Sequence, residues 1–115
     1  MRSDADRVRD ILEATAKIRE RAADSIGAFL GDEMLQVWAI HYLQVIGEAA
    51  RGVSQSLQER HPEVPWPQIV ALRNILVHEY FGLNLHQVWT MIQEDLPALQ
   101  EQVRHIHSQI APDSG

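Results

Sequence analysis

Five polar residues interrupt an otherwise apolar stretch in the middle of the chain. The stretch "LRNILVHEYFG", residues 72 to 82, carries Arg73, Asn74, His78, Glu79 and Tyr80 among Leu, Ile, Val and Phe. Arg presents a planar, permanently charged fork that matches phosphate oxygens, and His gives or takes protons near neutral pH. Cleavage of RNA without a metal ion needs a base for the ribose 2′-hydroxyl, an acid for the leaving 5′-oxygen and positive charge on the phosphorane. Arg73 and His78 are therefore candidate catalytic residues, and Asn74, one helical turn before His78, is a candidate for orienting the imidazole or the phosphate.

The same spacing has an ordinary structural interpretation. The chain has six His in 115 residues. The number of Arg residues followed five positions later by His that is expected by chance is therefore roughly 0.5. His and Arg are also common near the C-terminal end of a helix, where they interact favourably with exposed carbonyls. The spacing alone leaves a stabilised helix end open beside a catalytic site.

Composition restricts the class of protein. A chain of 115 residues has the size of one ordinary domain, so we expect a single domain at 1–111 and a frayed tail at 112–115. The chain contains no Cys, which excludes disulfides, thiolate zinc sites and cysteine nucleophiles and favours a cytoplasmic protein. No apolar run approaches the roughly 18 residues of a membrane span. The net charge of −6 argues against a general nucleic-acid binder, but charges balance within 51–92, where any anion site should lie.

Apolar residues recur at helical spacing along most of the chain, and no strand pattern appears. The first amphipathic helix is expected at 4–24, capped by Ser3 or Asp4, and is followed by a loop between Gly27 and Gly31. Asp32 should cap the next helix, and Asn84 should cap another one. The remaining expectations are a largely apolar helix at 33–60, a Pro-rich loop, a helix at 67–80, a helix from 84 that Pro97 kinks or restarts, and a final helix to residue 110. These elements predict an all-α bundle of four or five helices.

The helix at 67–80 shows two apolar stripes. Ile69, Leu72, Ile75 and Leu76 fall on one side and should face the core. A second stripe, on the outer arc beside Arg73 and His78, consists of Val70, Val77 and Phe81. Packing against a two-fold copy would bury this stripe and bring two copies of His78 together, so one could act as base and the other as acid. We therefore expect a homodimer through this helix.

Four separate strings resemble the HEPN superfamily, specifically the HepT-like toxins of MNT–HEPN toxin–antitoxin pairs. These strings are "IGEA", "PEVPW", "RNILVHEYF" and "VWTMIQEDLP", and the similarity is close over about residues 43 to 100. The resemblance implies an all-helical dimer that cleaves RNA without a metal ion or other cofactor, with Arg73 and His78 as the catalytic pair. Asn74 matches the polar residue that commonly follows this arginine.

The resemblance also implies a means of control. Tyr80 matches the tyrosine that a nucleotidyltransferase antitoxin adenylylates in the HepT-like branch. A bulky, negatively charged adenylyl group beside His78 would repel the substrate phosphate. The chain has no Gly-rich phosphate loop or carboxylate cluster for Mg²⁺, so the transferase must be a partner. A larger assembly of such dimers with the antitoxin stays open.

Two acidic residues near the motif have open roles. Glu48, in the otherwise apolar helix at 33–60, could support the site through Arg73 or Arg51, or could simply be solvated. Glu79 stands where other family members often have Gly, and its carboxylate could slow the approach of phosphate or orient His78. An alternative function also stays open: a non-catalytic HEPN subunit that docks a minimal nucleotidyltransferase and presents a substrate or nucleotide to it.

Overall fold

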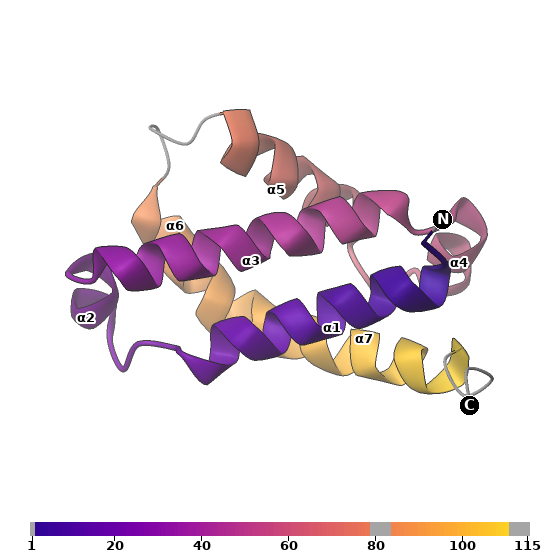
Figure 1. The fold of residues 1–115 in the computed structure, drawn as a ribbon, viewed down its shortest axis with the longest axis horizontal. Helices are drawn as coiled ribbons and strands as arrows, with labels where there is room; N and C mark the ends of the chain where they lie inside the picture. The colour runs from indigo at the N-terminus through magenta and orange to yellow at the C-terminus, as the bar shows by residue number, and fades with distance from the viewer. Residues whose placement is uncertain (1, 79–83, 111–115) are drawn as a thin grey trace.

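The computed structural model describes residues 2–78 and 84–110, with only the backbone of Val77 and His78. Within these ranges the secondary structure is entirely helical, which confirms the predicted all-α bundle (Figure 1). None of the described helices is long and apolar enough to span a membrane. The elements are α1 (Asp4–Glu20), α2 (Ile26–Leu30), α3 (Glu33–Gly52), α4 (Gln55–Arg60), α5 (Trp66–His78), α6 (Leu85–Thr90), a π-helical turn η2 (Met91–Asp95) and α7 (Leu96–Ile110).

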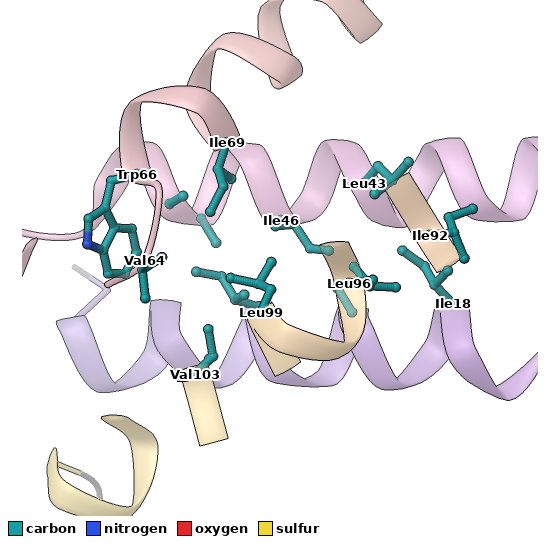
Figure 2. Close-up of a cluster of buried hydrophobic side chains, with 14 of the residues drawn as sticks. Ile18, Leu43, Ile46, Val64, Trp66, Ile69, Ile92, Leu96, Leu99 and Val103 are labelled. Carbon is teal, nitrogen blue, oxygen red and sulfur yellow. The ribbon is translucent and has the colours of Figure 1, made fainter. Parts of the chain in front are cut away.

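The long helix α3 organises the bundle. It packs against α1 on one side and against α5 on another, while α1 also packs along α7 (Figure 1). Figure 2 shows the buried side chains that α3, α5, η2 and α7 direct toward one another, among them Ile46, Ile69 and Leu99. Within the described ranges α5 has extensive contacts with α3 only. The helix that carries the candidate catalytic residues therefore lies at the edge of the bundle.

Local sequence signals explain where the helices begin. Ser3 forms a capping box with Asp6, because the Ser3 side chain accepts from the Asp6 N–H and the Asp6 carboxylate accepts from the Ser3 N–H. Asp32 accepts from the Leu35 N–H at 3.0 Å, and Asn84 accepts from the His86 N–H at 3.0 Å. Each cap satisfies a backbone donor that has no partner inside its helix. The predicted caps at Ser3, Asp32 and Asn84 are confirmed.

Three predicted boundaries were wrong. The first helix ends at Glu20 instead of residue 24, and the expected loop between Gly27 and Gly31 contains α2, capped by Ser25. The predicted helix at 33–60 is divided into α3 and α4, because α3 ends at Gly52 with Val53 as its C-cap and Ser54 caps α4. The hydroxyl of Ser54 accepts from the Leu57 N–H and donates to an Asp4 carboxylate oxygen at 2.6 Å. A short side-chain network therefore overrides the continuous helical pattern.

The prediction that the helix kinks or restarts at Pro97 is confirmed, because α7 begins at Leu96. Pro97 lies in the first turn of α7, directly after η2. Pro has no backbone N–H and its ring crowds the carbonyl four residues earlier, so the ordinary i to i−4 register fails there. The chain accommodates this by widening one turn, in which the Leu96 N–H donates to the Met91 carbonyl.

Candidate functional site

Helix α5 carries the candidate residues, and its beginning is fixed by Trp66. The Trp66 side chain is buried in the core, and its indole Nε1 donates to the His61 carbonyl at 3.0 Å. Pro67 follows within the first helical turn, where a missing N–H costs no hydrogen bond. These two residues set the position from which α5 runs along α3.

The predicted core stripe of α5 is correct except for Ile75. Ile69 and Leu76 are buried and Leu72 is half-buried, but Ile75 is 46% exposed. Val70, predicted to lie on an outer dimer stripe, is itself half-buried and packs against the core of its own chain. Of the other stripe residues, the side chain of Val77 and the whole of Phe81 lie outside the described residues.

Helices α3 and α5 cross closely where Arg73 passes Gly47. A Cβ atom on Gly47 would lie 3.1 Å from the Arg73 Cα atom and 3.0 Å from Cγ, and closer still to the Arg73 Cβ atom. Real Cβ contacts are almost never so short, so only glycine permits this crossing. The close approach brings the base of the Arg73 side chain against α3.

The Arg73 guanidinium is held from two sides. Its Nε donates to Glu48 Oε2 at 2.8 Å, and its Nη1 donates to Asn74 Oδ1 at 3.1 Å. The Arg73 side chain is 23% exposed and that of Glu48 is 58% exposed, so the ion pair lies at the edge of solvent. Within the part of the chain that the structure describes, Nη2 has no hydrogen-bond partner, and it can donate to a phosphate oxygen.

His78 is the last residue of α5, five positions after Arg73. Regular helix geometry places position 78 about 7.5 Å further along the axis and about 140° around it. Gln44 supports this end of α5, because its side-chain Nε2 donates to the Leu76 carbonyl at 3.4 Å. This bond connects the turn that carries His78 to α3.

The described residues bring together some of the predicted site. Arg73, Asn74 and Glu48 form one bonded group, and Glu48 pairs with Arg73 instead of Arg51. Glu79 and Tyr80 lie outside the described residues. Within residues 2–78 and 84–110, no three His, Asp or Glu side chains lie close enough together to hold a metal ion.

Two residues that position the site were missed at the sequence level. Gly47 stands in the middle of a long helix, where glycine is unfavourable relative to alanine by about 1 kcal/mol, and this is the usual sign of a close backbone approach. The sequence therefore contained a usable signal for Gly47. Gln44 gave none, because an isolated glutamine on a helix is compatible with any surface position.

Comparisons with known proteins agree on one family. A model of the family described as "HepT-like: Ribonuclease HepT-like" matches residues 11–106. "Putative RNase MJ1380" of Methanocaldococcus jannaschii is 37% identical over 82% of this chain and 87% of its own length. "Probable ribonuclease HepT" of Thermococcus cleftensis is 35% identical over 86% of this chain and 91% of its own length. No significant match was found among solved structures.

Proposed function

Since the chain belongs to the ribonuclease HepT-like family, we propose that it is a metal-independent endoribonuclease and the toxin of a cytoplasmic toxin–antitoxin pair. The observation that carries the proposal is the Arg73 guanidinium, which Glu48 and Asn74 hold at the solvent edge of α5. A fixed, partly exposed cation on the same helix as His78 suits a phosphate substrate. The relatives named as ribonucleases support the same class of reaction.

The proposed reaction uses two copies of His78. The neutral imidazole of one copy takes the proton from a ribose 2′-hydroxyl, and the 2′-oxygen forms a bond to the adjacent phosphorus. The bond from phosphorus to the 5′-oxygen breaks, and the imidazolium of the other copy gives its proton to that oxygen. Arg73 stabilises the negative charge that develops on the phosphorane. The products are a 2′,3′-cyclic phosphate and a 5′-hydroxyl.

Glu48 and Asn74 act in this scheme by positioning Arg73. Glu48 fixes Nε and Asn74 fixes Nη1, which leaves the Nη2 amino group to donate to the substrate. An arginine side chain has several rotatable bonds, and holding it before the substrate arrives reduces the entropy lost on binding. Neither residue needs to contact the RNA for this role.

The two copies of His78 would meet in a homodimer formed by α5. Val70, Val77 and Phe81 are the residues that we assign to this interface on the sequence pattern. The half-buried state of Val70 reduces its contribution, whereas the exposed side chain of Ile75 offers apolar surface on the same helix. A two-fold interface of this kind is self-complementary, so each protomer would supply the same residues.

Control of the toxin would come from a nucleotidyltransferase antitoxin that adenylylates Tyr80. The added phosphate is negative and bulky, and it would stand two residues from His78. The test is co-expression with an MNT-type nucleotidyltransferase, followed by intact-mass measurement. The proposal predicts a mass gain of AMP units that Tyr80→Phe abolishes, together with loss of ribonuclease activity in the modified protein only. An equal mass gain in Tyr80→Phe would contradict this assignment.

A second candidate is a non-catalytic subunit that docks a nucleotidyltransferase and presents a substrate to it. The specific observation in its favour is that the Glu48 carboxylate already forms an ion pair with Arg73. The net charge of −6 also disfavours RNA binding. The isolated chain separates the two candidates. RNA cleavage by the chain alone supports the ribonuclease, and absence of cleavage by protein with unmodified Tyr80 supports the docking subunit.

A further inference from the structure

An apolar groove lies between α5 and the η2–α7 segment, and residues of α3 also line it. Its volume is about 390 Å³, near the lower end of the range for ligand sites. Its apolar walls come from three separate parts of the chain, namely α3, α5 and η2–α7, and include Ile46, Ile69, Leu72 and Leu99. Figure 2 shows Ile46, Ile69 and Leu99 directed toward one another from these elements. The groove exists because α5 packs against α3 and makes no comparably extensive contact with α7 in the described ranges.

The ionisable side chains that line this groove are all acidic. They are Glu63, Glu94 and Asp95, and no Lys, Arg or His is among the described lining residues. Glu63 interacts with His61 at 3.3 Å, but no described Lys, Arg or His side chain forms an ion pair with Glu94 or Asp95. Both of these carboxylates are exposed. The groove therefore repels phosphate groups and attracts positive charge, which excludes RNA as its ligand.

The acidic wall is built by the unusual turn before Pro97. Met91, Glu94 and Asp95 all belong to η2, and all line the groove. π-helical turns are rare and occur frequently at functional sites. The opposite end is fixed by Gln102, whose Nε2 donates to the Glu63 carbonyl at 3.1 Å. The groove is thus preformed at both ends.

We propose that this groove docks an amphipathic helix of a partner protein, in which apolar residues at helical spacing are flanked by Lys or Arg. The lining residues from Pro65, just before α5, to Leu72 within it span roughly 10 Å, and those of η2–α7 span 91 to 102, roughly 16 Å. Two to three turns of a helix match these lengths. An added strand has no sheet edge to join in the described residues, and a Pro-rich peptide would lack the aromatic walls that it needs.

The proposed docking site goes beyond the ribonuclease and does not depend on it. Leu72 faces the groove, while the neighbouring Arg73 contacts α3. A bound helix would bridge α5 to α7 and so brace the helix that carries Arg73, without covering the guanidinium. The two sites can therefore be occupied together.

The test measures fluorescence anisotropy of a labelled helical peptide of Leu, Ala and Lys, about three turns long, added to the full chain. Matched peptides replace every Lys with Glu, or scramble the Leu spacing. The groove variants are Glu94→Arg with Asp95→Arg, which reverses the charge, and Ala98→Trp, which fills the groove from an exposed position. Glu13→Arg with Glu20→Arg, on the exposed side of α1, changes the net charge equally and serves as the control.

We expect the Lys peptide to bind with a Kd on the order of 10 µM and to weaken about tenfold or more with either groove variant. The control pair should change the Kd less than about twofold, and the Glu peptide should not bind. Equal weakening by the control pair would show general charge attraction and overturn the proposal, as would absence of binding to the wild type. If Ala98→Trp instead abolished self-association in sedimentation, the occupant would be a second copy, and the proposed partner would be wrong.

Discussion

Arg73 crosses Gly47 so closely that no side chain larger than hydrogen fits between the two helices. This crossing fixes the start of the Arg73 side chain, and Glu48, the next residue of α3, then binds the end of it. Two consecutive residues of one helix therefore position a single arginine of another. The site depends on the α3–α5 packing as much as on the side chains of α5.

Gly47→Ala should therefore disturb both stability and catalysis. The new Cβ atom would overlap Arg73 and push α5 away from α3, and overpacking of this kind costs about 1–3 kcal/mol. Thermal unfolding should show a fall in Tm of roughly 5 °C or more. Gly27→Ala is the matched control, because a Cβ there meets only Ser25 Oγ at 3.9 Å. A Gly47→Ala protein as stable as this control would contradict the tight crossing.

Glu48→Gln should separate positioning from stability. An ion pair at the edge of solvent contributes only about 0–1 kcal/mol to folding, so the Tm should change little. Misplacement of a catalytic cation costs far more in rate, and we expect kcat for RNA cleavage to fall roughly 10- to 100-fold. Glu13→Gln, on exposed α1, is the control. Faster cleavage by Glu48→Gln would mean that the carboxylate competes with the substrate phosphate, and the positioning role would be lost.

The dimer interface can be tested with a single charge. Val77→Asp would place a carboxylate in the stripe that we assign to the two-fold contact, and burial of an unpaired charge there should dissociate the dimer. Sedimentation velocity should show a dimer for the wild type and a monomer for the variant, with loss of cleavage in the same protein. Met34→Asp alters another exposed apolar side chain and should leave the dimer intact. A monomeric wild type at tens of micromolar would remove the interface from the account.

The capping box of α1 predicts a pH dependence. The Ser3 N–H and side chain, followed by the charges of Arg9 and Arg2, hold the pKa of the Asp6 carboxyl below its ordinary value of 3.8. A lowered pKa in the folded state stabilises the fold above the unfolded value, and this contribution is lost as pH falls through the folded pKa. Asp6→Asn should therefore be less stable than wild type at neutral pH and approach it as the pH falls through the lowered pKa of Asp6. An unchanged difference in denaturant midpoint across this range would contradict the cap.

Much of the fold was predictable because its signals are local. The caps at Ser3, Asp32 and Asn84 and the start of α5 beside Pro67 depend on residues within one helical turn. The division at Ser54 was not predicted, because it depends on Asp4, fifty positions away along the chain. The exposure of Ile75 was missed for a related reason: helical spacing gives a face, but only the packing partner decides how wide the buried face is.

The candidate site was also predictable only in part. Arg73, Asn74 and His78 could be chosen from their chemistry and spacing, and the resemblance to a family gave that choice its weight. The sequence could not decide whether Glu48 pairs with Arg73 or with Arg51, because the answer depends on how α3 packs against α5. Gln44 donates to a backbone carbonyl, and no pattern of side chains predicts such a contact.

The proposed function requires that this chain cleave RNA without a metal ion through Arg73 and His78. The most direct measurement incubates the isolated protein, with Tyr80 shown unmodified by intact mass, with total tRNA and mRNA in excess EDTA. Wild type is compared with Arg73→Ala, Arg73→Lys and His78→Ala, each shown to be folded by circular dichroism. We predict cleaved ends bearing 2′,3′-cyclic phosphate for the wild type, and none for the three variants, because lysine lacks the planar fork. Absence of cleavage by the wild type, or full activity in either alanine variant, would contradict the account.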